Sequence, residues 1–119
     1  MLIVDDDMRN IFSLTSLLTD KGITVLEADN GKEALLRLAA HPETSVVLMD
    51  IMMPEMDGFD TIRAIRRDGR HRDLPIIAMT AKVMQGDQQK CFDAGASDYI
   101  AKPIDTDKLM SLLRVWSGR

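Results

Sequence analysis

The sequence alternates between short apolar runs and longer segments with apolar residues at helical spacing, and this alternation limits the fold more than any other feature. The short runs have the length and the β-branched content of strands. The segments between them repeat apolar residues every three or four positions, as an amphipathic helix does, and the last one, through Leu109, Leu113 and Trp116, is the clearest. The expected strands cover residues 2–4, 23–28, 45–49, 75–79 and 97–101.

This order of elements predicts an α/β fold with a parallel sheet. Parallel neighbours need a crossover connection, and a helix between each pair of strands supplies it. The first, third and fourth runs are almost wholly apolar, as expected for central strands that are covered on both faces. The second and fifth runs contain charged residues, which favours the edges of the sheet. Asn30, with Glu33 three residues later, predicts a helix start, and Gly22 and Gly95 predict helix ends.

Length and composition are those of one globular domain, which we place at residues 1–119. Hydrophobic residues make up 45% of the 119 residues and charged residues 29%, the usual balance for such a domain. No apolar run has the length of a membrane span, and no leader-like segment opens the sequence. The single cysteine, Cys91, cannot form an internal disulfide, which is typical of a reducing compartment. We expect a cytoplasmic protein, or the cytoplasmic part of a larger sensor, without direct membrane contact.

The net charge of −4 argues against nucleic acid as a direct partner, because phosphate binding is built on basic surface. One local stretch is basic, and we interpret it as the exposed face and exit of a helix. Its members are Arg63, Arg66, Arg67, Arg70 and Arg72.

Polar residues collect where the expected strands end. In an open parallel α/β sheet, the functional crevice lies beyond the carboxyl ends of the strands. By itself each of these residues has an ordinary explanation, because Asp forms turns, Thr caps helices and Lys is usually solvated. Their joint placement at one edge of the sheet favours a functional site. The residues that follow the first, third, fourth and fifth strands are Asp5, Asp6, Asp7, Asp50, Thr80 and Lys102.

Carboxylates gathered at one point repel one another, and a divalent cation compensates for that repulsion. The ligands offered are oxygen atoms without clustered His or Cys, which favours Mg²⁺, or Mn²⁺, over zinc. Mg²⁺ keeps coordination positions for a phosphate, and a carboxylate can itself attack a phosphoryl group. Asp50 is the expected nucleophile, because it is a single acid at the end of the central strand with acids and a lysine on its flanks.

Four motifs carry a resemblance to a known family. VDDD (4–7), MDIMMPEMDG (49–58), TA (80–81) and GASDYIAKP (95–103), in this order and spacing, resemble the response-regulator receiver domain of two-component signalling. The resemblance covers essentially the whole chain. It implies a flavodoxin-like (βα)₅ fold, with a five-stranded parallel sheet in the order 2-1-3-4-5 and helices on both faces.

The resemblance also implies a role for each site residue. Asp50 is the phosphoacceptor and Asp6 the direct Mg²⁺ ligand. Asp5 acts mainly through a metal-bound water, and the backbone carbonyl of Met52 completes the protein ligands. Met52 and Lys82 border the path of a hydrolytic water in the family and tune the lifetime of the phosphate.

Further implied roles concern the response to phosphorylation. Lys102 pairs with the phosphoryl group, and Thr80 hydrogen-bonds it. Tyr99 is the aromatic switch that turns inward, which changes the face formed by the fourth helix, fifth strand and fifth helix. The bond from Lys102 to Pro103 is expected to be cis, as the family usually has it.

The expected partner is a histidine kinase or a histidine phosphotransfer domain, whose phosphohistidine gives its phosphoryl group to Asp50. The resemblance implies that the receiver catalyses its own phosphorylation and dephosphorylation, so its classification as an enzyme stays open. In a hybrid protein, the parent chain is a histidine kinase. The segment from Thr80 to Asp105 is most similar to receivers of hybrid histidine kinases.

Several alternatives stay open at this point. A stand-alone single-domain response regulator has the same motifs, and a receiver can also act as an interaction module without phosphorylation. A haloacid-dehalogenase-like phosphatase also uses an Asp nucleophile with Mg²⁺, but its first strand ends in DxD followed by Thr or Val. A flavin-binding module needs a Ser/Thr/Gly-rich loop after the first strand, where this chain has three acids.

Overall fold

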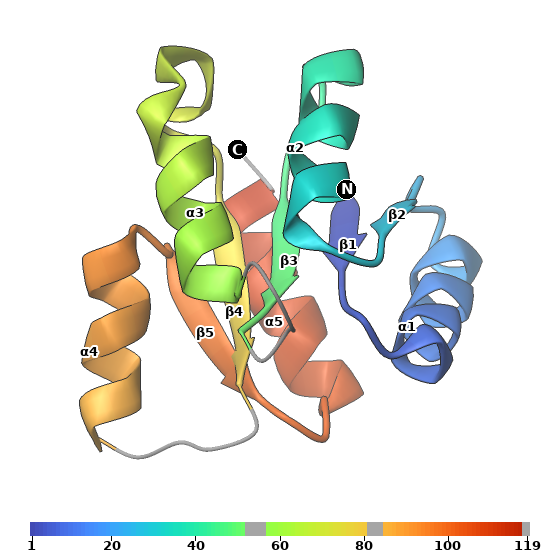
Figure 1. Cartoon of the computed structure of the whole chain (residues 1–119). Helices are drawn as coiled ribbons and strands as arrows, with labels where there is room; N and C mark the ends of the chain where they lie inside the picture. The colour runs from blue at the N-terminus through green and yellow to red at the C-terminus, as the bar shows by residue number, and fades with distance from the viewer. Residues whose placement is uncertain (52–56, 81–84, 118–119) are drawn as a thin grey trace.

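The computed structural model describes residues 1–51, 57–80 and 85–117. In these residues, strands and helices alternate along the chain as the sequence predicts (Figure 1). The strands are β1 (Leu2–Val4), β2 (Leu26–Ala28), β3 (Val47–Asp50), β4 (Ile76–Thr80) and β5 (Asp98–Ala101). The helices are α1 (Met8–Asp20), α2 (Gly31–Ala40), α3 (Gly58–Arg67), α4 (Gln85–Ala94) and α5 (Thr106–Ser117), and a 3₁₀ helix, η1 (Gly69–His71), follows α3.

The strands form one parallel sheet in the order β2-β1-β3-β4-β5. This confirms the predicted (βα)₅ fold, including its central and edge strands. Along β1, Leu2 pairs with Val47 and Val4 with Met49 of β3. β3 in turn pairs Asp50 with Met79 of β4. The register therefore brings the ends of the central strands to one edge of the sheet.

The helices cover the sheet on both faces, as predicted (Figure 1). Successive residues of a strand point to opposite faces, so Val47 and Met49 pack into one apolar cluster and Val46 and Leu48 into the other. The first cluster lies under α2, α3 and α4, and the second lies under α1 and α5. Cys91 is buried in the first cluster, as a small apolar side chain would be.

Side-chain caps explain where the helices begin. Asn30 accepts a hydrogen bond from the backbone N–H of Glu33 at 2.7 Å and caps α2, as predicted. Asp7 and Asp57 cap α1 and α3 in the same way. Gly95 follows α4 with a φ of 114°, a conformation that favours glycine, so the predicted helix end is also confirmed.

Two local predictions were inaccurate. The second strand was predicted over residues 23–28, but only Leu26–Ala28 pair with β1, because β1 itself offers just three residues for pairing. Arg66 was assigned to the exposed face of a helix, yet it is half-buried. Its guanidinium group donates to Gly95 O at 2.9 Å and to His71 O at 2.7 Å, and so ties α3 and η1 to the turn before β5. In the described part of the chain, no helix has the length and apolar character needed to span a membrane.

Candidate phosphoacceptor and metal site

Two buried carboxylates lie side by side at the carboxyl edge of the sheet. Asp5 directly follows β1 and is 0% exposed, and Asp50 is the last residue of β3 and is 2% exposed. β1 and β3 are neighbouring strands, so the sheet itself fixes the two side chains next to each other. Asp6 is exposed to solvent at the same edge. Carboxylate oxygens of all three acids lie within 4.8 Å of one another.

The ammonium group of Lys102 bridges the two buried acids. Its Nζ atom lies 3.2 Å from Asp5 Oδ2 and 3.3 Å from Asp50 Oδ1. Lys102 reaches this position because it directly follows β5, where its backbone N–H donates to Thr80 O at 2.7 Å. Burial opposes the charge on Lys102, but the Asp50 and Asp5 carboxylates together outweigh burial and raise the pKa of the lysine. Lys102 therefore contributes a positive charge between the acids at neutral pH.

Asp5 accepts hydrogen bonds on both of its carboxylate oxygens. The backbone N–H of Asp7 donates to Oδ1 at 2.9 Å. The side-chain amide of Asn10 donates to Oδ2, the same oxygen that Lys102 contacts. Sequence reasoning missed Asn10. Its position five residues after a strand-terminal acid did not distinguish it from an ordinary helix cap, because Asn is common near the start of a helix.

Thr80 and Tyr99 lie on the neighbouring strands. Thr80 is the last residue of β4, is 8% exposed and pairs with Ala101 of β5. Tyr99 is half-buried on β5, and its ring packs edge-on against Phe92 of α4, with centroids 6.0 Å apart and the planes at 80°. Tyr99 thus contacts α4 through its ring.

The chain after β5 and the start of α3 complete the surroundings. The Lys102–Pro103 peptide bond is cis, the geometry that the family resemblance implies. The backbone N–H of Gly58 donates to Ile51 O at 3.1 Å. A Cβ at Gly58 would collide with the backbone oxygen of Asp50 and lie 2.6 Å from Ile51 Cα, so the start of α3 packs directly on the end of β3. Met52 and Lys82 lie outside the described residues.

The acidic cluster fits a divalent cation. Among the residues that the structure describes, three carboxylates lie near the one ammonium group of Lys102, which leaves a net negative charge in a largely buried position. All the side-chain ligands are carboxylate oxygens, the donors that Mg²⁺ prefers. Asp5, Asp6 and Asp50 are therefore the side chains that would hold the ion, and the exposed side of Asp6 gives the ion a path from solvent.

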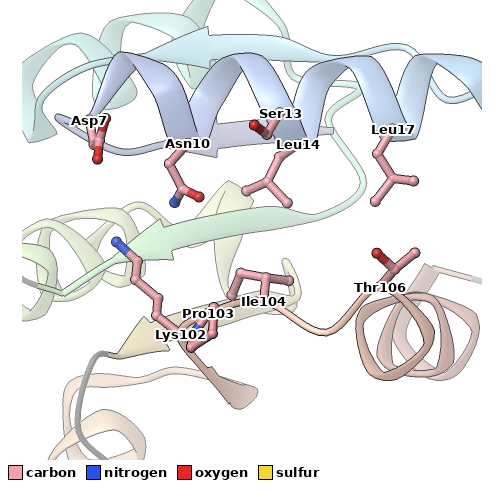
Figure 2. A pocket seen from close by; sticks show the side chains of 9 residues that line it. All are labelled: Asp7, Asn10, Ser13, Leu14, Leu17, Lys102, Pro103, Ile104 and Thr106. Carbon is pink, nitrogen blue, oxygen red and sulfur yellow. The ribbon is translucent and has the colours of Figure 1, made fainter.

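A groove opens beside this cluster, between α1 and the chain that follows β5 (Figure 2). Its volume is ≈ 630 Å³. Leu14 and Leu17 of α1 line it on one side and Ile104 on the other, while Asn10 and Lys102 lie at the end next to the acids. The groove thus joins an apolar surface to the charged site.

The family model of the response regulator receiver domain matches residues 1–114. The chain belongs to this family. The match distinguishes a receiver from the phosphatase and the flavin-binding module that the sequence left open.

Two similar proteins place the receiver in different contexts. The sensor histidine kinase GacS of Pseudomonas protegens is 38% identical over 121 residues, which cover 99% of this chain and 13% of GacS. Protein PilH of Pseudomonas aeruginosa is 36% identical, over 95% of this chain and 93% of PilH. The receiver therefore spans a small part of one relative and nearly all of the other.

A solved structure of a similar receiver is described with a bound metal ion. The receiver domain of the sensor histidine kinase PA1611 of Pseudomonas aeruginosa, described with a magnesium ion coordinated in its active-site cleft, superimposes with a TM-score of 0.85. It is 33% identical, and the match covers 99% of this chain and 96% of that domain.

Proposed function

We propose that Asp50 accepts a phosphoryl group from a phosphohistidine, with Mg²⁺ held by Asp5, Asp6 and Asp50. The observation that carries this proposal is the Lys102 ammonium shared between the buried Asp5 and Asp50, with Asp6 beside them. A cation fixed against two acids suits a site that must gain further negative charge, because it is already in place when the phosphoryl group arrives.

In the transfer, an Asp50 carboxylate oxygen attacks phosphorus, a P–O bond forms and the P–N bond to the donor imidazole breaks. The electrons of the broken bond return to the imidazole ring. Lys102 neutralises charge on the transferred oxygens, and Thr80, at the end of the adjacent strand, donates a hydrogen bond to them. When bound, Mg²⁺ neutralises charge on the same oxygens. As the family resemblance implies, Asp6 would bind the ion directly, Asp5 would bind mainly through water, and the Met52 carbonyl would complete the protein ligands.

The new dianionic group then changes the output face. Thr80 and Lys102 move toward the phosphoryl oxygens, and Tyr99 turns inward into the space that Thr80 leaves. Tyr99 contacts Phe92 of α4, so its rotation changes the surface formed by α4, β5 and α5. Met52 and Lys82 set the lifetime of the phosphate, and we expect a moderately long one because Met52 is apolar.

The donor is a histidine kinase or a histidine phosphotransfer domain in the cytoplasm. The groove beside Lys102 gives this donor a contact surface next to Asp50. The similarity to GacS supports a receiver that is part of a hybrid sensor kinase. The similarity to PilH over nearly its whole length supports the alternative, a stand-alone response regulator. Mn²⁺ replaces Mg²⁺ in this proposal without a change of ligands, since both ions prefer oxygen donors.

A labelling experiment tests the proposal. The purified receiver is mixed with Mg²⁺ and a histidine phosphotransfer domain that carries radioactive phosphate on histidine. We expect label on the parent chain and on the control Asp93→Asn, an exposed acid on α4, and none on Asp50→Asn. Equal labelling of Asp50→Asn and the parent would contradict Asp50 as the acceptor.

A further inference from the structure

Asn10 joins the groove to the acidic cluster. It lies in the first turn of α1, where its backbone N–H donates to Asp7 O at 3.0 Å. Its side chain is half-buried and reaches back to Asp5, five residues earlier. Figure 2 shows the amide of Asn10 and the amino group of Lys102 extending toward each other from opposite sides of the groove.

Asn10 and Lys102 donate to the same oxygen atom. Asp5 Oδ2 accepts from the Asn10 amide and lies 3.2 Å from Lys102 Nζ, while Asp5 Oδ1 accepts from the Asp7 backbone at 2.9 Å. Asp5 is 0% exposed, so loss of a donor leaves a buried carboxylate oxygen short of a hydrogen bond. Among the described residues, Asp5 Oδ2 thus accepts hydrogen bonds from a neutral donor, the Asn10 amide, and from a charged donor, the Lys102 ammonium group.

We propose that Asn10 is a positioning residue for phosphoryl transfer, which holds Asp5 with a neutral amide and thereby keeps Lys102 shared between Asp5 and Asp50. This inference rests on the proposed function of Asp50. The amide satisfies Asp5 without adding a second positive charge, so it orients the carboxylate and leaves its attraction for a cation intact. A lysine or arginine in the same place would cancel part of that attraction.

The loss of this amide has two consequences at the site. Of the donors to Asp5 Oδ2 among the described residues, Lys102 then remains. The ammonium group therefore moves toward Asp5 and away from Asp50 Oδ1, which lies 3.3 Å from it in the parent chain. Lys102 is then poorly placed for a phosphoryl group on Asp50, which lowers the rate of transfer. Asp5 is also more fully neutralised by Lys102, which weakens the binding of Mg²⁺.

Two substitutions of Asn10 distinguish the effect of its hydrogen bond from the effect of its side-chain size. Asn10→Leu keeps a side chain of similar size but cannot donate, and Asn10→Gln keeps the amide. Ser16→Leu is the matched control, because it places a leucine at an exposed position of the same helix, outside the groove and away from the acids. Thermal unfolding of each variant shows that the fold is retained.

Two measurements are made on each protein. Isothermal titration calorimetry gives the Mg²⁺ dissociation constant without a phosphodonor, and acetyl phosphate at several Mg²⁺ concentrations gives the rate at saturating metal. We expect Asn10→Leu to raise the dissociation constant and lower the saturating rate, each about tenfold, as is typical when a residue that orients a metal ligand is lost. Asn10→Gln recovers most of both values, and Ser16→Leu behaves as the parent.

Two outcomes overturn the inference. Parent-like values for Asn10→Leu show that the amide does not position Asp5, and equal losses in Asn10→Leu and Asn10→Gln show that packing alone matters. These results differ from a failure of the proposed function, in which the parent chain itself takes no phosphoryl group from acetyl phosphate while Mg²⁺ binding is still measurable.

Discussion

At the scale of single residues, the site depends on how one lysine is divided between two acids. Asp5 and Asp50 are both buried, and Lys102 lies 3.2 Å from one and 3.3 Å from the other. Without this cation, the two buried carboxylates would repel each other with no positive charge between them. Lys102 thus supplies part of the positive charge that a bound divalent cation would supply.

Substitution Lys102→Gln should therefore have opposite effects on metal binding and on transfer. Removal of the ammonium group leaves three acids uncompensated, so Mg²⁺ binds more tightly. The rate of phosphorylation by acetyl phosphate falls about 100-fold, because the charge on the transferred oxygens loses a fixed partner. Calorimetry and intact-protein mass spectrometry measure the two effects. Lys108→Gln, an exposed position on α5, serves as the control, and weaker Mg²⁺ binding in Lys102→Gln would contradict this account.

At the scale of secondary-structure elements, the end of β3 is held in place by the start of α3. Gly58 is the first residue of α3, and its missing Cβ allows the helix to touch the backbone of Asp50 and Ile51. Seven residues, 51 to 57, separate the last residue of β3 from the first residue of α3. The position of Asp50 therefore depends on how α3 packs against the end of β3.

Substitution Gly58→Ala should reduce both stability and phosphorylation. A methyl group here meets backbone atoms, which cannot rotate away as a side chain would, so α3 and the end of β3 must separate. Overpacking of this kind costs about 1–3 kcal/mol, measured by urea unfolding. Gly69→Ala is the control, because nothing lies within 4 Å of a Cβ at Gly69. Equal stability of the two variants would show that the contact between α3 and β3 is not tight.

The elements also show which features the sequence alone can predict. The parallel order and the positions of Asp5, Asp50, Thr80 and Lys102 were predictable, because alternation of strands and helices brings all strand ends to one edge. The half-buried position of Arg66 was not, because its partners are backbone carbonyls of η1 and of the turn before β5. These segments come close to Arg66 only when the helices pack on the sheet. The periodicity of the sequence around Arg66 therefore cannot predict the contacts.

The donor role of Asn10 was missed for a related reason. A sequence reading assigns Asn near the start of a helix to capping, and here the cap is Asp7, whose side chain accepts from the Arg9 backbone N–H at 3.0 Å. With the cap already filled, the Asn10 amide is available to a carboxylate that precedes the helix. This distinction depends on where the first turn begins, which is known only from the folded backbone.

At the scale of the whole molecule, β5 connects the site to the opposite end of the sheet. Lys102 follows the carboxyl end of β5, and Asp98 begins the strand. The Asp98 carboxylate accepts a hydrogen bond at 3.1 Å from Trp116 Nε1 on α5, and the next residue, Tyr99, packs against Phe92 on α4. Any displacement of β5 therefore reaches both helices that flank it.

Trp116 is the single tryptophan of the chain, so its fluorescence should report phosphorylation from the far end of β5. A phosphoryl group on Asp50 draws Lys102 toward it and shifts the population of β5 positions, which changes the contact between Asp98 and the indole N–H. We expect acetyl phosphate with Mg²⁺ to change the Trp116 emission of the parent and to leave that of Asp50→Asn at its value with Mg²⁺ alone. Mass spectrometry of the same samples gives the phosphorylated fraction. An unchanged emission spectrum in a fully phosphorylated sample would show that the signal does not travel through β5 to α5.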